Sequence, residues 1–143
     1  MVENNNSINK KKSQSELLEL DDIYLHHKNR HFKHNPYIGY TIKELKKNVN
    51  GKNILNTNSL GLRCEELSDL KQVNSILLGG SVAFSSCASE EKNTISSLLE
   101  KNTNKKILNC GIGGHILKQH ISLYFNYLKS IETNNIILLF GFN

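Results

Sequence analysis

Apolar residues gather in three short runs in the second half of the chain, and the sequence before them is largely polar. The runs cover residues 73–78, 107–110 and 136–140. Short runs that stay nearly apolar, without strict alternation, are typical of strands buried on both faces of a sheet. We therefore predict three strands at these positions and a hydrophobic core that begins near Val73.

Two helices are expected between these strands. Residues 94–101 predict a helix that turns Ile95, Leu98 and Leu99 inward. After the second strand, apolar residues recur at alternating steps of four and three, at Leu117, Ile121, Tyr124, Leu128 and Ile131. This spacing is typical of one face of an amphipathic helix. Strands that alternate with helices predict βαβ units, and hence an α/β fold with a parallel sheet.

The sequence before the first strand has a different character. Residues 1–15 are rich in Asn, Ser and Lys and predict a disordered tail. A short helix is expected within 16–29, and 31–58 reads as extended segments with turns at Gly39 and Gly51. The expected division is a polar tail (1–15), a lead-in segment of short helix, extended pieces and turns (16–72), and an α/β domain (73–143).

Charge and cysteine content narrow the functional classes. The net charge is +5, but the lysines are scattered and the chain has only two arginines, Arg30 and Arg63. We therefore do not expect nucleic-acid binding, which favours clustered charge. The three cysteines, an odd number without a C-x-x-C pair, argue against a disulfide framework or a structural zinc site.

The sequence also bears on location. No apolar stretch approaches the length of about 18 residues that a membrane-spanning helix needs. The first sixteen residues lack the apolar middle of a signal peptide. We expect a cytoplasmic protein without a membrane span.

Each predicted strand is followed by a residue or turn that could take part in binding or catalysis. Ser81 follows the first strand and two glycines, 111–114 form a glycine-rich turn after the second, and Asn143 follows the third. In parallel α/β sheets, ligands bind at the carboxyl ends of the strands. We therefore expect these three positions to share one site.

Each of these three positions also has an alternative role. Ser81 is a candidate nucleophile, provided that a base removes its proton, or it caps the following helix. The glycine turn offers N–H groups for an oxyanion, or it is a nucleotide-binding or ordinary tight turn. The dinucleotide fingerprint fails because Ile116 occupies the third glycine position, and the G-x-S-x-G elbow fails because Ala83 replaces its second glycine. Asn143 is a neutral amide donor or simply a polar strand end.

In combination these segments resemble a known family. Gly79-Gly80-Ser81, the motif Asn109-x-Gly111-x-x-Gly114, and Gly141-Phe142-Asn143 resemble the first three sequence blocks of the SGNH hydrolases, also called the GDSL esterase/lipase family. Gly80 and Val82 replace the Asp and Leu that are usual in the first block. A lead-in that some bacterial members carry is similar to 35–63, so the resemblance covers about residues 35–143.

The resemblance implies a function and a fold. Ser81 would be the nucleophile, and the Gly114 N–H and the Asn143 side-chain amide would join the Ser81 N–H in an oxyanion hole. The family hydrolyses esters, often acetyl or other acyl groups on sugars, lipids or small molecules, and needs no metal or cofactor. The implied fold is a three-layer α/β/α domain with a flavodoxin-like parallel sheet, here incomplete at its C-terminal side.

The fourth block of the family, Asp-x-x-His, has no counterpart in the 143 residues. None of the six histidines has an Asp three positions before it; they are His26, His27, His31, His34, His115 and His120. His115 lies beside the glycine turn and is the weak candidate for a base, whereas His120 is expected on a helix surface. His27, His31 and His34 share helical spacing, but no further ligand completes a metal site.

Two main interpretations remain open. The first is a truncated SGNH esterase or acyl hydrolase, weakly active or inactive, because catalytic residues act as a unit. The second is a non-catalytic SGNH-like module that binds a glycan or a partner protein. A complete enzyme in which another chain supplies the histidine is a third possibility.

Overall fold

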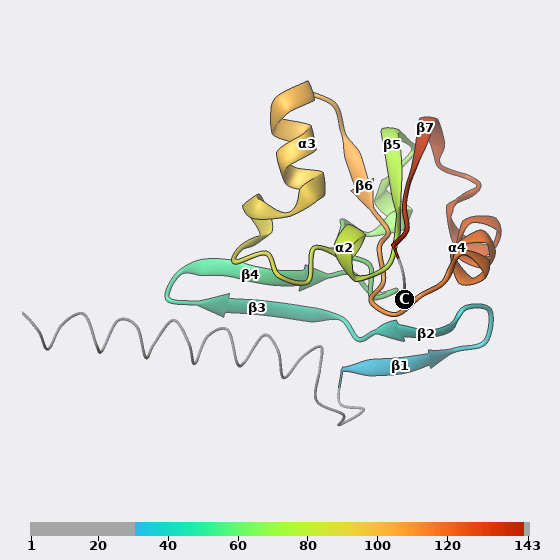
Figure 1. Ribbon diagram of the computed structural model, residues 1–143, viewed down its shortest axis with the longest axis horizontal. Helices are drawn as coiled ribbons and strands as arrows, with labels where there is room; N and C mark the ends of the chain where they lie inside the picture. The colour runs from blue at the N-terminus through green and yellow to red at the C-terminus, as the bar shows by residue number, and fades with distance from the viewer. Residues whose placement is uncertain (1–30, 142–143) are drawn as a thin grey trace, which may run out of the picture. The chain divides into compact units, whose positions relative to one another are not determined.

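The computed structural model describes residues 31–141 (Figure 1). The predicted polar tail (1–15) and the short helix within 16–29 lie outside the described residues. The described part is a mixed α/β structure with a three-stranded parallel sheet and two antiparallel hairpins.

The parallel sheet confirms the three predicted strands. They are β5 (Gln72–Gly79), β6 (Ile107–Asn109) and β7 (Glu132–Leu139), in the spatial order β6-β5-β7. Ile76 lies level with Leu108 on one side and with Ile136 on the other. The central strand is buried over most of its length, which explains its nearly continuous apolar sequence.

Two hairpins precede the sheet, where the sequence predicted extended segments and turns. They consist of β1 (Phe32–Asn35) with β2 (Gly39–Ile42), and β3 (Leu45–Val49) with β4 (Lys52–Thr57). Asn50 and Gly51, which join the second pair, both have positive φ angles of 51° and 76°. Two such residues form the primed turn that matches the twist of a tight hairpin.

The core includes part of the segment before the sheet. Ile38 and Leu62 are 1% and 0% exposed, and they belong to the same buried cluster as Ile76 and Leu108. The prediction that the core begins near Val73 was therefore wrong. Single apolar residues in hairpins and turns contribute to it, although they leave no run in the sequence.

The helices pack against different parts of the sheet. Helix α3 (Ile95–Thr103) contacts the cluster of Leu77, Ala83 and Ile107 through Ile95 and Leu99. Leu98, predicted to turn inward, is 45% exposed instead. The short α2 (Ser81–Phe84) follows β5, and α4 (Leu117–Leu123) lies on the other side of the sheet from α3 (Figure 1).

The apolar stripe predicted after β6 is wrong in its first half. Leu117 and Ile121 are 49% and 51% exposed, and α4 buries His120 and Leu123 instead. A π-helical turn, Tyr124–Leu128, continues α4, and the Lys129 N–H donates to the Tyr124 carbonyl five residues back. Because this turn holds five residues, Leu123 and Leu128 both reach the core, and the four-and-three spacing does not describe the helix.

Within residues 31–141, none of the helices is long and apolar enough to cross a membrane.

Candidate functional site

Ser81 lies at the end of the central strand. β5 ends at Gly79, and Ser81 is the first residue of α2. Its carbonyl accepts hydrogen bonds from the Ser86 N–H and hydroxyl, both at 3.1 Å. Within residues 31–141 neither its own hydroxyl nor its N–H forms a hydrogen bond, and the side chain is partly exposed. The hydroxyl and the N–H are therefore available to a ligand.

The glycine-rich turn after β6 is tied to the same end of the sheet. The Ile112 N–H donates to the Gly79 carbonyl at 2.9 Å, two residues before Ser81. A side chain at Gly111 would collide with the Phe84 N–H and with Ala83, so the turn passes directly against α2. The structure thus brings the predicted serine and the predicted glycine turn together, because only glycine permits this close approach.

Gly114 has a φ of +79° and is exposed. The Tyr40 hydroxyl donates to the neighbouring Gly113 carbonyl at 2.9 Å, which attaches the turn to β2. Among the described residues, no acceptor pairs with the Gly114 N–H. This N–H is therefore available to a ligand.

Asn143, the third predicted site residue, lies outside the described residues. The strand that leads toward it is in place: Leu139, the last residue of β7, is level with Gly79 at the end of β5. The carboxyl ends of the three predicted strands therefore lie at the same end of the sheet.

Asn109 has a role that the sequence did not indicate. Its side chain is 1% exposed and donates to the Ala83 carbonyl at 3.0 Å and to the Ser96 hydroxyl at 3.2 Å. Its Oδ1 accepts the Gly111 N–H at 3.0 Å. One amide thus joins β6, α2, α3 and the glycine turn, and it positions the helix that carries Ser81.

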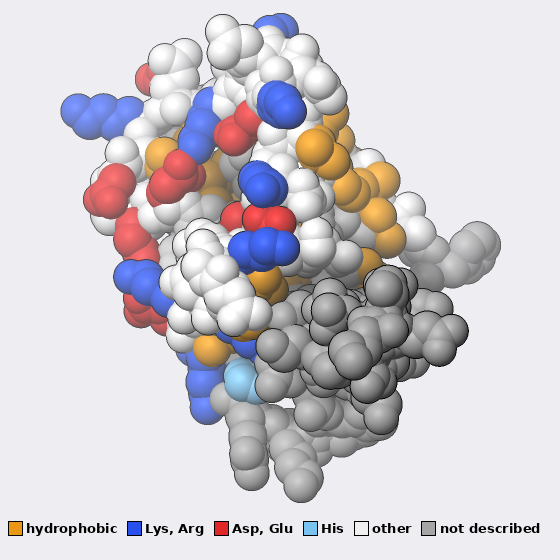
Figure 2. Space-filling model, turned by 90° about the vertical axis from the view of Figure 1, so that its left-hand side faces the viewer, with side chains coloured by type: hydrophobic (Ala, Val, Ile, Leu, Met, Phe, Trp, Pro, Cys, Tyr) orange, Lys and Arg blue, Asp and Glu red, His pale blue; other side chains and the backbone are white. Residues whose placement is uncertain are grey.

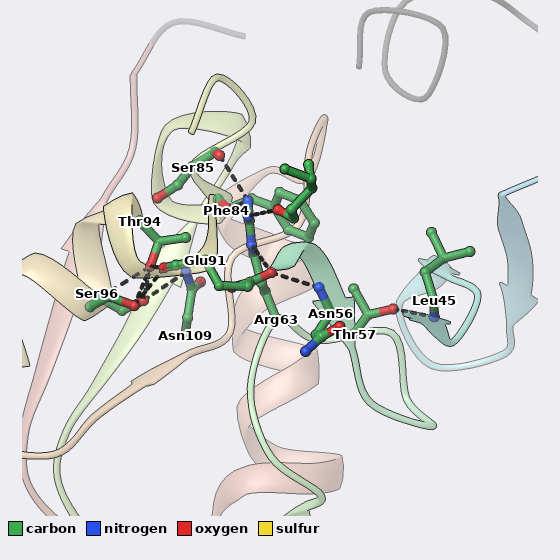
Figure 3. A network of polar contacts seen from close by, with 12 residues as sticks. Leu45, Asn56, Thr57, Arg63, Phe84, Ser85, Glu91, Thr94, Ser96 and Asn109 are labelled. Carbon is green, nitrogen blue, oxygen red and sulfur yellow. Dashed lines mark hydrogen bonds and ion pairs between the residues drawn. The ribbon is translucent and has the colours of Figure 1, made fainter. Parts of the chain in front are cut away.

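Arg63 supports the same helix from the other end (Figure 3). Its guanidinium donates to the carbonyls of Phe84 and Ser85 at 3.1 and 2.9 Å, where α2 ends. It also donates to the Ile54 carbonyl at 2.8 Å and to Glu91 at 2.9 Å. The sequence pointed to Arg63 only as part of the lead-in motif, because most of its partners are distant backbone carbonyls, which have no sequence signature.

His115 and His120 are both 0% exposed, which corrects the prediction of His120 on a helix surface. Their rings lie 5.4 Å apart, between Tyr40 and Phe140. Burial and the neighbouring His115 lower the pKa of His120 to about 4, and burial also lowers the pKa of His115. His115 Nε2 pairs with the Tyr40 carbonyl at 2.9 Å. Within the described chain no hydrogen bond joins an imidazole to Ser81, so neither histidine is placed as its base.

The remaining predictions concern metals. Within residues 31–141, no three His, Cys, Asp or Glu side chains converge on a point where a metal ion could sit. Of the histidines with helical spacing, His34 lies on strand β1, and His27 lies outside the described residues.

No protein-family model matches the chain, and no curated protein matches it either. The functional argument therefore depends on the site itself. At the end of the central strand Ser81 offers a hydroxyl and an N–H, and the glycine turn tied to that strand end offers the Gly114 N–H.

Proposed function

We propose that this chain carries the nucleophile and oxyanion hole of an SGNH-type serine ester hydrolase. The domain would be a flavodoxin-like, three-layer α/β/α fold, of which residues 73–143 form a part. The observation that carries the proposal is the position of Ser81. It begins a helical turn at the end of the central strand, without a partner for its hydroxyl among the described residues, and a glycine turn is tied to the same strand end.

The chemistry would proceed as follows. The Ser81 oxygen would attack the acyl carbon of an ester while a base takes the hydroxyl proton, and the negative charge would develop on the former carbonyl oxygen. Collapse of this intermediate would break the ester C–O bond and release the alcohol, which takes up the proton, and water would then hydrolyse the acyl-serine. The N–H groups of Ser81 and Gly114 would donate to that oxygen, together with the Asn143 amide by the family resemblance. Removal of one such donor costs about 3 kcal/mol in studied enzymes. The substrate would be an acyl or acetyl ester of a sugar, lipid or small molecule.

A base for Ser81 is not evident in the 143 residues. The sequence contains no Asp-x-x-His, and His115 and His120 are buried among aromatic rings. A serine without a base is a poor nucleophile. We therefore expect this chain by itself to hydrolyse esters weakly or not at all.

Chemical rescue tests the proposal. The chain is assayed with p-nitrophenyl acetate with and without imidazole, which can replace the missing base, and Ser81→Ala is compared with Ser89→Ala. We expect imidazole to produce turnover above the uncatalysed imidazole rate in the parent chain and in Ser89→Ala, but not in Ser81→Ala. Labelling by a fluorophosphonate, located by mass spectrometry, should fall on Ser81. Equal rates for both variants, with no label on Ser81, would refute the proposal.

A second measurement tests the origin of the base. The gene is sequenced past the codon for Asn143. An Asp codon directly after it, and an Asp-x-x-His about 100 residues further on by the usual domain size, would support an SGNH esterase. A stop codon directly after it would leave this product without its own base.

The alternative is a non-catalytic SGNH-like module that binds a glycan or a partner protein. It is favoured by the two histidines nearest the glycine turn, His115 and His120, which are buried and form no hydrogen bond with Ser81 among the described residues. It predicts saturable binding of a carbohydrate or protein without Ser81-dependent turnover under rescue. A cytoplasmic location belongs to either proposal and is supported by the three free cysteines, Cys64, Cys87 and Cys110.

A further inference from the structure

Cys64 and Cys110 form a pair of thiols that the fold brings together. Cys64 lies in the irregular segment between β4 and the 3₁₀ turn Leu67–Asp69, and Cys110 directly follows β6. Cys64 packs against the buried cluster that contains Cys110, and the two thiols lie within hydrogen-bonding reach of each other. The third cysteine, Cys87, is exposed. Two of the three free cysteines are therefore neighbours, although they are distant in the sequence.

The two thiols differ in accessibility. Cys110 is 0% exposed, whereas Cys64 is partly exposed and lines a polar cavity of about 410 Å³. Burial and the neighbouring Cys64 raise the pKa of the Cys110 thiol well above its usual range, so Cys110 stays protonated. The thiolate is the reactive form of cysteine. A reagent in the cavity therefore meets Cys64 first, with Cys110 behind it.

The charges around the cavity restrict which oxidant can enter. The lining carries five carboxylates against three cations, and two of the carboxylates belong to Glu65 and Glu66, which directly follow Cys64. Figure 2 shows the side of the molecule that carries the β3–β4 hairpin and α3, where Lys and Glu side chains intermix. The excess negative charge repels anionic oxidants such as glutathione disulfide, but not hydrogen peroxide, which is small and neutral.

We propose that Cys64 and Cys110 are a reversible oxidation site, at which a neutral peroxide converts the two thiols into a disulfide. The Cys64 sulfur attacks one oxygen of hydrogen peroxide, the O–O bond breaks, and the Cys64 proton leaves with the other oxygen as water. Cys64 is then a sulfenic acid. The Cys110 sulfur attacks the Cys64 sulfur, the S–O bond breaks, and the hydroxyl leaves with the Cys110 proton as water. Two thiols and one peroxide thus give one disulfide and two waters.

The disulfide joins two supports of the helix that begins with Ser81. Cys64 follows Arg63, whose guanidinium holds the carbonyls at the end of α2. Cys110 precedes Gly111, which passes directly against α2. Oxidation therefore adds a covalent link between the two segments that position this helix. The proposal itself depends neither on Ser81 as a nucleophile nor on ester hydrolysis.

The test is peroxide oxidation of the folded full chain, followed by alkylation of free thiols and peptide mass spectrometry. The expected product links Cys64 to Cys110 within one chain, and dithiothreitol reverses it. Hydrogen peroxide should form this link about tenfold faster than glutathione disulfide at equal concentration, because the cavity repels the anion. In urea, where separation along the chain decides which thiols meet, links from Cys87 to either of the other two cysteines should also appear.

Three variants separate the roles of the cysteines. Cys110→Ser should lose the link and leave a sulfenic acid on Cys64, which dimedone traps. Cys64→Ser should lose the link and show no dimedone adduct on Cys110. Cys87→Ser is the matched control and should form the link at the parent rate. Circular dichroism reports whether each variant folds, and if Cys110→Ser does not, Cys110→Ala, which keeps the buried position apolar, provides the same comparison.

Four outcomes would overturn the proposal. They are no Cys64–Cys110 link in the folded chain, the same mixture of links in the folded and the urea-unfolded chain, a dimedone adduct on Cys110 in Cys64→Ser, and a reaction with glutathione disulfide as fast as that with peroxide. Esterase activity is not a readout here, so failure of this proposal and failure of the proposed function are distinguishable.

Discussion

The Nε of Arg63 donates to Oε1 of Glu91 at 2.9 Å, and the Arg63 side chain is only 2% exposed. Glu91 also accepts the Asn56 N–H at 2.6 Å, so one carboxylate links the arginine to β4. The remaining donors of Arg63 hold the carbonyls of Ile54, Phe84 and Ser85. This pair therefore connects the end of α2, which begins with Ser81, to the β3–β4 hairpin.

Arg63→Lys should destabilise the fold strongly. Lysine cannot reproduce the planar fork, so buried carbonyls and the Glu91 carboxylate would lose donors. We expect a loss of about 3 kcal/mol, because several of the four guanidinium hydrogen bonds would be lost at about 1 kcal/mol each. Urea unfolding followed by circular dichroism measures it. The control is Lys52→Ala, which removes an exposed ion pair with Glu90 and should cost less than about 0.5 kcal/mol. Equal effects of the two changes would show that the Arg63 network carries little stability.

Two leucines can test which face of α4 is buried in the core. Leu123 is 0% exposed and Leu117 is 49% exposed. Leu123→Ala should cost about 3 kcal/mol, because it leaves a cavity in the core. Leu117→Ala should change the free energy of unfolding by less than about 0.5 kcal/mol. If Leu117→Ala destabilised the fold more than Leu123→Ala in thermal unfolding, the helix would instead bury the apolar face predicted from the sequence.

The parallel sheet could be predicted because strands buried on both faces leave short apolar runs. β5 is the clearest case, since its six-residue run lies within the observed strand. The hairpins were recognisable only as extended pieces with turns. Pairing between β1 and β2 depends on contacts that a single sequence does not display. One example is the packing of Ile38, from the turn between them, into the core cluster that contains Ile76 and Leu108.

The site was partly predictable for the same reason. Ser81 and the glycine turn each follow a strand, so the parallel sheet places both at the end where its strands terminate. The roles of the supporting residues were not predictable, because Arg63 donates mainly to backbone carbonyls distant in sequence and Asn109 reaches the Ala83 carbonyl and the Ser96 hydroxyl, 26 and 13 residues away. The burial of His120 was missed because the π-helical turn breaks the regular helical period on which the prediction relied.

The stability of the fold should fall as the pH decreases from 6.5 to about 4. The pKa of His120 is lowered to about 4 in the folded chain, from 6.5. Between these values the unfolded chain binds the proton and the folded chain does not, so acid favours unfolding. The loss should reach about 3 kcal/mol below the lower pKa. His120→Phe should flatten this part of the pH profile in urea unfolding, and His34→Phe, on an exposed strand position, is the control. A profile that His120→Phe leaves unchanged would contradict the assignment.

The outer edge of β7 should drive self-association. Among residues 31–141 no strand pairs with that edge, and Ile136 and Leu138 are 43% and 57% exposed. An unpaired edge with exposed apolar side chains is a template for association. Leu138→Lys should weaken association about tenfold, since it removes one leucine from the contact and adds a charge. Asn134→Lys adds the same charge on the same strand, at a position that is already polar and exposed, and should have a smaller effect. Sedimentation velocity over a range of concentrations measures both. A parent chain that stays monomeric, or equal effects of the two lysines, would show that this edge is not the contact.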